Sequence, residues 1–133
     1  MNRFKVENET VLDTKTNLMW MQNSLEEEFT FAEAINIKKE FAGFDDWRLP
    51  TIDELVAIIN YQAHPAYFEG FMSTESSSTL FYFWSSSPYV GNPSYYAWSV
   101  NFNGGFVGLN HRNGAFPVRL VRHNGLQENT ETV

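Results

Sequence analysis

The side chains that could carry out chemistry in this sequence are few and scattered. The acidic residues 26–28 lack the loop spacing of a calcium site, and the serines 85–87 lack the Gly-x-Ser-x-Gly turn that exposes a nucleophile. The histidines lie too far apart for a local metal-binding motif: they are His64, His111 and His123. We therefore expect no catalytic residue, no metal and no cofactor.

Arg48 is the cation with the most defined surroundings. It lies in Trp47-Arg48-Leu49-Pro50, between an indole and a proline and directly before a predicted helix. Its guanidinium could bind an anionic ligand. We favour a structural clamp instead, in which Arg48 is held by the nearby Asp45 and Asp46 and by loop carbonyls.

The composition predicts one folded domain. Of the 133 residues, 43% are hydrophobic and 17% aromatic, which is enough apolar surface for a core. Cysteine is absent, which excludes disulfides, thiolate catalysis and Cys-ligated metals. We expect a single domain over residues 1–123 and a polar, disordered tail over residues 124–133.

The formal net charge of −7 argues against anionic partners. Binding to a phosphate backbone needs clustered cations, and the 9 basic residues are scattered, so we expect no nucleic-acid partner. Anionic membranes and sulfated polysaccharides are disfavoured as well, unless Arg112, Arg119 and Arg122 form a local patch. No run approaches the roughly 18 apolar residues of a membrane span, so we expect no membrane insertion.

Alternating apolar residues predict strands near both ends of the chain. Asn8-Glu9 and Asn103-Gly104-Gly105 have the composition of tight turns between neighbouring strands. A further turn is expected over residues 110–114. The predicted strands cover residues 4–7, 10–13, 18–21, 80–86, 96–102, 106–109 and 116–122.

Two capping boxes predict the helices. Thr30 with Glu33 and Thr51 with Glu54 have the required spacing, and the apolar stripes that follow extend to residues 42 and 61. Residues 62–79 lose this periodicity and are expected to form a long loop; the alternative is a short helix over residues 65–72. The grouping of strands, helices and a late antiparallel sheet is that of an α+β domain.

Four segments in this order resemble the bacterial domain family named for the C-terminal domain of the Legionella collagen-like adhesin. The resemblance covers residues 4–122. The segments are Val11-Leu12-Asp13-Thr14-Lys15-Thr16-Asn17-Leu18-Met19-Trp20, Trp47-Arg48-Leu49-Pro50-Thr51 with Glu54-Leu55, Phe83-Trp84-Ser85-Ser86-Ser87, and Val118-Arg119-Leu120-Val121-Arg122.

The resemblance implies a C-type-lectin-like fold with two helices, a long loop region and a twisted antiparallel sheet, whose last strand pairs near the first. It also implies a ligand surface on the long loop and late strands, a secreted or cell-surface location, and a homo-oligomer, namely a trimer. The cysteines of formylglycine-generating enzymes, the histidine cluster of sulfoxide synthases and the calcium motifs of true C-type lectins are all absent from this sequence. Catalysis and calcium-dependent sugar binding are therefore disfavoured.

The leading hypothesis is a non-catalytic ligand-binding module, adhesin- or receptor-like and of bacterial or phage origin, that binds a protein or a glycan. Aromatic and amide side chains of the late loops supply contact area and adaptable hydrogen bonds. The expected ligand-binding residues are Tyr89, Asn92, Tyr95, Tyr96, Asn110, His111, Arg112 and Asn113. The expected structural residues are Trp20, Trp47, Arg48, Pro50, Trp84 and Arg119.

Two alternatives stay open for the same residues. The aromatic surface could be an oligomer interface of a structural subunit, which would show as a concentration-dependent mass. An enzyme would need a deep pocket with perturbed carboxylates or histidines.

Overall fold

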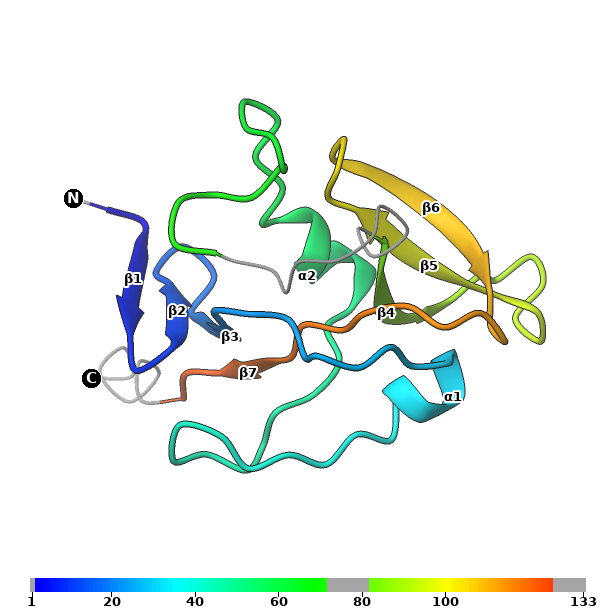
Figure 1. The fold of residues 1–133 in the computed structure, drawn as a ribbon, viewed down its shortest axis with the longest axis horizontal. Coiled ribbons are helices and arrows are strands. Elements are labelled where there is room, and N and C mark those ends of the chain that lie inside the picture. Colours follow the sequence, from blue (N-terminus) through cyan, green and yellow to red (C-terminus); the bar gives the residue numbers. More distant parts are fainter. Residues whose placement is uncertain (1, 72–81, 126–133) are drawn as a thin grey trace, which may run out of the picture.

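The computed structural model describes residues 2–71 and 82–125, which form two antiparallel sheets and two short helices (Figure 1). The elements are β1 (Phe4–Glu7), β2 (Thr10–Asp13), β3 (Leu18–Met21), α1 (Phe31–Ala34), α2 (Ile52–Val56), β4 (Tyr82–Pro88), β5 (Tyr96–Asn101), β6 (Phe106–His111) and β7 (Val121–His123). The α+β class is thus confirmed. The C-type-lectin-like arrangement stays a prediction.

The first sheet has the strand order β1-β2-β3-β7. Asn8 and Glu9 both have positive φ, at 53° and 63°, as a two-residue turn between twisted strands requires. This turn aligns Glu7 with Thr10 and confirms the first predicted hairpin. β7 pairs antiparallel with β3, so the last strand joins the sheet that holds the first.

The second sheet has the order β4-β5-β6, with β5 in the centre. Its β5–β6 turn contains Gly105, whose φ is +77°. A Cβ at this position would lie 3.0 Å from Ile59 and 3.2 Å from Ala66, so the close approach of the turn to the segment that follows α2 favours glycine. The predicted hairpin is confirmed, with β6 reaching two residues further than expected.

Both predicted capping boxes are present, but both helices are shorter than predicted. Ile35 follows α1 and is 47% exposed, so the apolar stripe expected beyond it has nothing to pack against. After α2, Ile58 and Ile59 are both buried, and Ile59 forms a β-bridge with Tyr67. Pairing with this later segment uses the Ile59 backbone and ends the helix, although Leu55, Ile58 and Ile59 keep the i, i+3, i+4 spacing of one buried helix face.

The predicted alternative helix over residues 65–72 is wrong for residues 65–71. Tyr67 lies in an isolated bridge and Phe71 ends a turn in which its amide donates to the Phe68 carbonyl at 3.2 Å; both rings lie in the core and are stacked at 6.4 Å. The remainder of the predicted loop lies outside the described residues, together with the start of the predicted strand at residues 80–81 and all of the predicted tail beyond residue 125.

The predicted closing strand is wrong over residues 116–120. Only residues 121–123 form β7, while Phe116 makes an isolated bridge with Phe29. The reason is burial on every side: Pro117, Val118, Arg119 and Leu120 are all buried, whereas an outer strand alternates buried and exposed positions. This segment passes beneath β4 and then leads into β7 (Figure 1).

Two groups of buried side chains form the core. One gathers Trp20, Leu55, Phe83, Val100 and Phe102 with their neighbours and lies between the first sheet, α2 and the second sheet. The other gathers Met21, Trp47, Leu49, Trp84 and Val118 with their neighbours, on the α1 side of the molecule.

The buried pair of Asp13 and Arg3 gives a test of the first sheet. Arg3 donates two hydrogen bonds of 2.7 Å to the fully buried Asp13 carboxylate. Burial raises the pKa of Asp13, but the hydrogen bonds from Arg3 and the Lys15 amide and the charge of Arg3 together lower it below its ordinary value. The unfolded chain therefore binds the proton of the Asp13 carboxyl group more tightly than the folded chain does. The stabilisation of the fold by this carboxylate is lost as the pH falls through the folded-state pKa of Asp13.

We predict that Asp13→Asn lowers the free energy of unfolding by about 1 to 3 kcal/mol at pH 7 and by clearly less at pH 3. Urea denaturation at the two pH values measures the difference. Asp53→Asn is the control, because Asp53 is exposed. An equal loss for Asp13→Asn at both pH values would show that the Asp13 charge does not stabilise the fold.

Candidate functional site

The structure brings all eight predicted ligand-binding residues to one end of the second sheet. Tyr89, Asn92 and Tyr95 lie in or beside the β4–β5 connection, and Tyr96 begins β5. Asn110 and His111 end β6, and Arg112 and Asn113 form the turn after it. Figure 1 shows these two loops together at the end of the sheet nearest α1. We call this region the loop-end surface.

Two tyrosines flank a histidine at the centre of the loop-end surface. The ring of His111 lies 5.6 Å from that of Tyr95 and 5.8 Å from that of Tyr96. Tyr95 is 55% exposed and Tyr96 38% exposed. His111 accepts a hydrogen bond at Nδ1 from the Asn113 amide, 3.2 Å away, which in a neutral imidazole leaves Nε2 as the donor. The Tyr95 and Tyr96 rings are inclined to the imidazole by 50° and 74°. We call this exposed cluster of three rings, with hydrogen-bonding groups at its rim, the platform.

The β4–β5 loop is held in place by its own backbone. The Tyr89 amide donates to the Tyr96 carbonyl at 3.0 Å, and the Asn92 amide donates to the Tyr89 carbonyl at 3.0 Å. The Asn92 carbonyl accepts from the amides of Tyr95 and Tyr96 at 3.2 and 3.1 Å. The ring of Tyr89 also packs edge-on against Trp98, at 5.6 Å. A loop tied down in this way loses little conformational entropy when it binds a ligand.

Arg112 joins the two loops of this surface. Its amide donates to the Tyr95 carbonyl at 2.8 Å, and its guanidinium donates to the Pro93 carbonyl at 2.7 Å while lying 4.6 Å from the Phe31 ring. The side chain of Asn110 is also used within the protein, because its oxygen accepts a hydrogen bond from the Ser99 hydroxyl. Both residues therefore support the surface from within.

A depression lies between the loop-end surface and α1. Its volume is about 380 Å³. Arg112 is the charged side chain in its lining, and the other lining groups are small or polar; the lining consists of Thr30, Ala32, Ser94, Arg112 and Asn113. Hydroxyl, amide and guanidinium groups at one depression suit a polar ligand.

The predicted structural residues are mostly buried. Trp20 and Trp84 are fully buried and Trp47 nearly so. The indole nitrogen of Trp84 donates to the Phe29 carbonyl at 2.7 Å, and that of Trp47 donates to the Phe41 carbonyl at 3.0 Å. The Pro50 carbonyl accepts from the Ser86 amide at 2.7 Å.

The predicted acidic partners of Arg48 are wrong, whereas a loop carbonyl, that of Leu49, does accept a hydrogen bond of 3.5 Å from its guanidinium. Its guanidinium donates two hydrogen bonds of 2.8 Å to Glu54, the acidic residue of the second capping box, and Asp46 instead pairs with Arg122 at 2.6 Å. Burial raises the pKa of Glu54, but the hydrogen bonds from Arg48 and the Thr51 amide lower it below its ordinary value. Arg48 is thus a clamp on the start of α2.

The local cationic patch that would have allowed binding to anionic membranes or sulfated polysaccharides does not form. Arg119 is buried at 1% exposure, while Arg112 lies over Phe31 and Arg122 is engaged with Asp46. The three arginines therefore present no common cationic surface.

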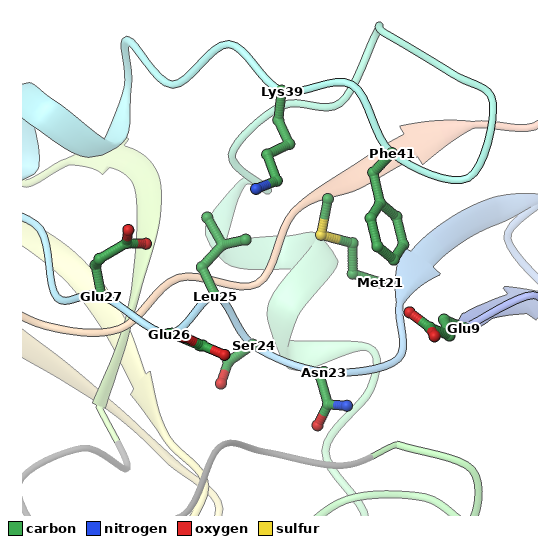
Figure 2. A pocket seen from close by; sticks show the side chains of 9 residues that line it. All are labelled: Glu9, Met21, Asn23, Ser24, Leu25, Glu26, Glu27, Lys39 and Phe41. Carbon is green, nitrogen blue, oxygen red and sulfur yellow. The ribbon is translucent and has the colours of Figure 1, made fainter.

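A second pocket, of about 360 Å³, escaped prediction from the sequence (Figure 2). Met21, Leu25 and Phe41 give it an apolar lining, and the carboxylates of Glu9, Glu26 and Glu27 lie around it with Lys39. Its residues come from separate segments, and the acidic run 26–28 alone resembles ordinary solvated charge. No local pattern in the sequence joins them.

Within residues 2–71 and 82–125, no group of three or more His, Asp or Glu side chains is placed to hold a metal ion. In the same part of the chain, no helix is long and apolar enough to cross a membrane. The fold and the loop-end surface together describe an α+β domain that carries exposed aromatic side chains at one end of its second sheet.

The sequence model of the Lcl C-terminal domain matches residues 9–122. The chain therefore belongs to the Lcl C-terminal domain family, as the four segments had indicated. No curated protein matches the chain significantly.

The bracing role of Arg112 gives a test of the loop-end surface. We predict that Arg112→Ala speeds hydrogen exchange at the amides of Tyr95 and Tyr96 by about tenfold, because it removes the Pro93 contact and the packing on Phe31. Hydrogen exchange followed by NMR measures this. Exchange at Leu12, in the first sheet, serves as the internal control. Unchanged exchange at both tyrosines would contradict the bracing role.

Proposed function

We propose that this domain is a non-catalytic, adhesin- or receptor-like module that binds a protein or a glycan through the loop-end surface. The observation that carries the proposal is the exposed platform of Tyr95, His111 and Tyr96 on a loop fixed by backbone hydrogen bonds. Exposed aromatic rings provide large contact area at low entropic cost, and a fixed loop preserves that advantage on binding. Membership of the Lcl C-terminal domain family supports an adhesin-like role.

The chemistry of the platform suits both ligand classes. The flat faces of tyrosine can pack against sugar rings or peptide side chains, while the Asn113 side chain and the polar depression next to it supply directional hydrogen bonds. The carboxylates with a perturbed pKa, Asp13, Asp46 and Glu54, are each bound to an arginine and lie outside the loop-end surface. This placement supports a binding role over a catalytic one.

A double substitution of Tyr95 and Tyr96 to Ala tests the proposal. On an array of glycans and extracellular proteins, we predict that it weakens the binding of the wild-type ligand by at least about tenfold, as loss of a central aromatic contact does. Tyr61→Ala is the matched control, because Tyr61 is 71% exposed and lies outside the loop-end surface. Equal binding by the double variant and the wild type would contradict the proposal.

The same double variant distinguishes ligand binding from the alternative function, in which the aromatic surface is an oligomer interface of a structural subunit. If the tyrosines form an oligomer interface, the double substitution lowers the mass measured by light scattering. An unchanged mass with weakened binding supports a ligand-binding surface.

A further inference from the structure

The sheet edges of this protein differ in how they are protected. An edge strand exposes unpaired N–H and C=O groups, and proteins usually cover it or place charges on it. β1 is an edge strand that carries Lys5 and Glu7. β7 is covered by Arg48, whose backbone exchanges two 2.9 Å hydrogen bonds with Val121.

The two edges of the second sheet are treated unequally. β4 is covered, because the Trp84 amide donates to the Pro117 carbonyl at 3.2 Å and the Ser86 amide donates to the Pro50 carbonyl. β6 pairs with β5 on one side only; among the described residues, its other edge receives one backbone bond, a local one from the Gly114 amide to the His111 carbonyl at 2.9 Å. Its sequence, Phe-Val-Gly-Leu-Asn-His, contains neither a charge nor a proline.

The backbone groups on the open edge of β6 can be assigned from the register. The amide of Arg112 bonds to Tyr95, the residue aligned with it, and inward-facing and outward-facing residues alternate along an antiparallel strand. Gly108 and Asn110 therefore face β5, whereas Val107, Leu109 and His111 direct their amides outward. Val107 is 42% exposed and Leu109 39% exposed, so the middle of the edge is apolar, and its backbone is unpaired within residues 2–71 and 82–125.

Charge indicates which partner suits this edge. No Asp, Glu, Lys or Arg occurs between Glu75 and Arg112, in a chain with a net charge of −7. Two copies that meet at β6 therefore place no like charges of this strand opposite each other. A charged partner, in contrast, would find no complementary group on β6.

We propose that β6 pairs antiparallel with β6 of a second copy, which joins the two three-stranded sheets into one continuous sheet. Two-fold symmetry requires the central residue to lie opposite itself, and the outward-facing residue in the middle of the edge is Leu109. Leu109 then lies against the partner's Leu109, and Val107 against the partner's His111. A contact of this kind uses the same surface on both copies, so it gives a dimer and leaves no free interface for a third copy.

The dimer places the two loop-end surfaces far apart. Each lies at the His111 end of β6, and antiparallel strands put these ends on opposite sides of the joined sheet. If the proposed function holds, the dimer bridges two ligands instead of binding one surface twice. The dimer itself does not depend on that function, because mass and ligand binding are measured separately.

Leu109→Lys tests the dimer, because it places two like charges opposite each other at its centre. Sedimentation equilibrium from about 1 to about 300 µM should show the wild-type chain passing from monomer to dimer, and the variant should need at least about tenfold higher concentration. Val6→Lys is the control, since Val6 is 50% exposed on β1, the edge strand of the other sheet, and this variant should behave as the wild type.

Hydrogen exchange identifies the surface. With rising concentration, the amides of Val107, Leu109 and His111 should become protected, while Gly108 and Asn110 are already protected by β5. A monomer over the whole range, a trimer, equal effects of Leu109→Lys and Val6→Lys, or no concentration-dependent protection of these three amides would each overturn the proposal.

Discussion

Both sheets depend on the buried segment of residues 116–123. Its backbone bonds to Phe29, Leu25 and Met21 on one side and to Trp84 of β4 and Arg48 on the other. Such a segment cannot be a regular strand, because it contacts two sheets that lie in different directions. It joins the two sheets instead, and we call residues 116–123 the seam. The seam supplies Val118, Leu120 and Val121 to the core and forms backbone hydrogen bonds on both of its sides.

Arg119 is the unusual residue of this seam. Its guanidinium is buried, donates to the carbonyl of Met21 at 3.0 Å and to that of Gln22, and lies 4.9 Å from the Tyr67 ring. Burial lowers the pKa of Arg119, but an arginine starts so high that it keeps its charge. Carbonyl dipoles and ring faces compensate this charge, and the cation ties the end of β3 to the aromatic core beneath the second sheet.

The sequence predicts the parts of this fold that rest on local chemistry. The Asn8-Glu9 turn, the β5–β6 hairpin and both capping boxes are formed within a few residues, so their patterns are sufficient. The predicted ligand-binding residues of the late loops also lie together on the loop-end surface, because these loops follow neighbouring strands. Helix lengths and the buried coil at residues 116–120 depend on which distant surfaces are available for burial. The partner of Arg48, Glu54, lies only six residues away, but its spacing from Thr51 indicated a capping role alone. The pocket around Met21 and Phe41 joins separate segments in the same way, and no local pattern marks it.

The central claim, that the seam and Arg119 make the two sheets one cooperative unit, is tested by urea unfolding of Arg119→Lys with fluorine-labelled tryptophans. The NMR signals of Trp20, in the first sheet, and Trp84, in the second, report each sheet separately. We predict that both signals of the wild-type chain disappear at one urea concentration. In the variant, both shift together to a lower concentration, by about 2 to 4 kcal/mol of stability, because lysine cannot reproduce the contacts of the guanidinium. Separate transitions, or a shift of only one signal, would contradict the account.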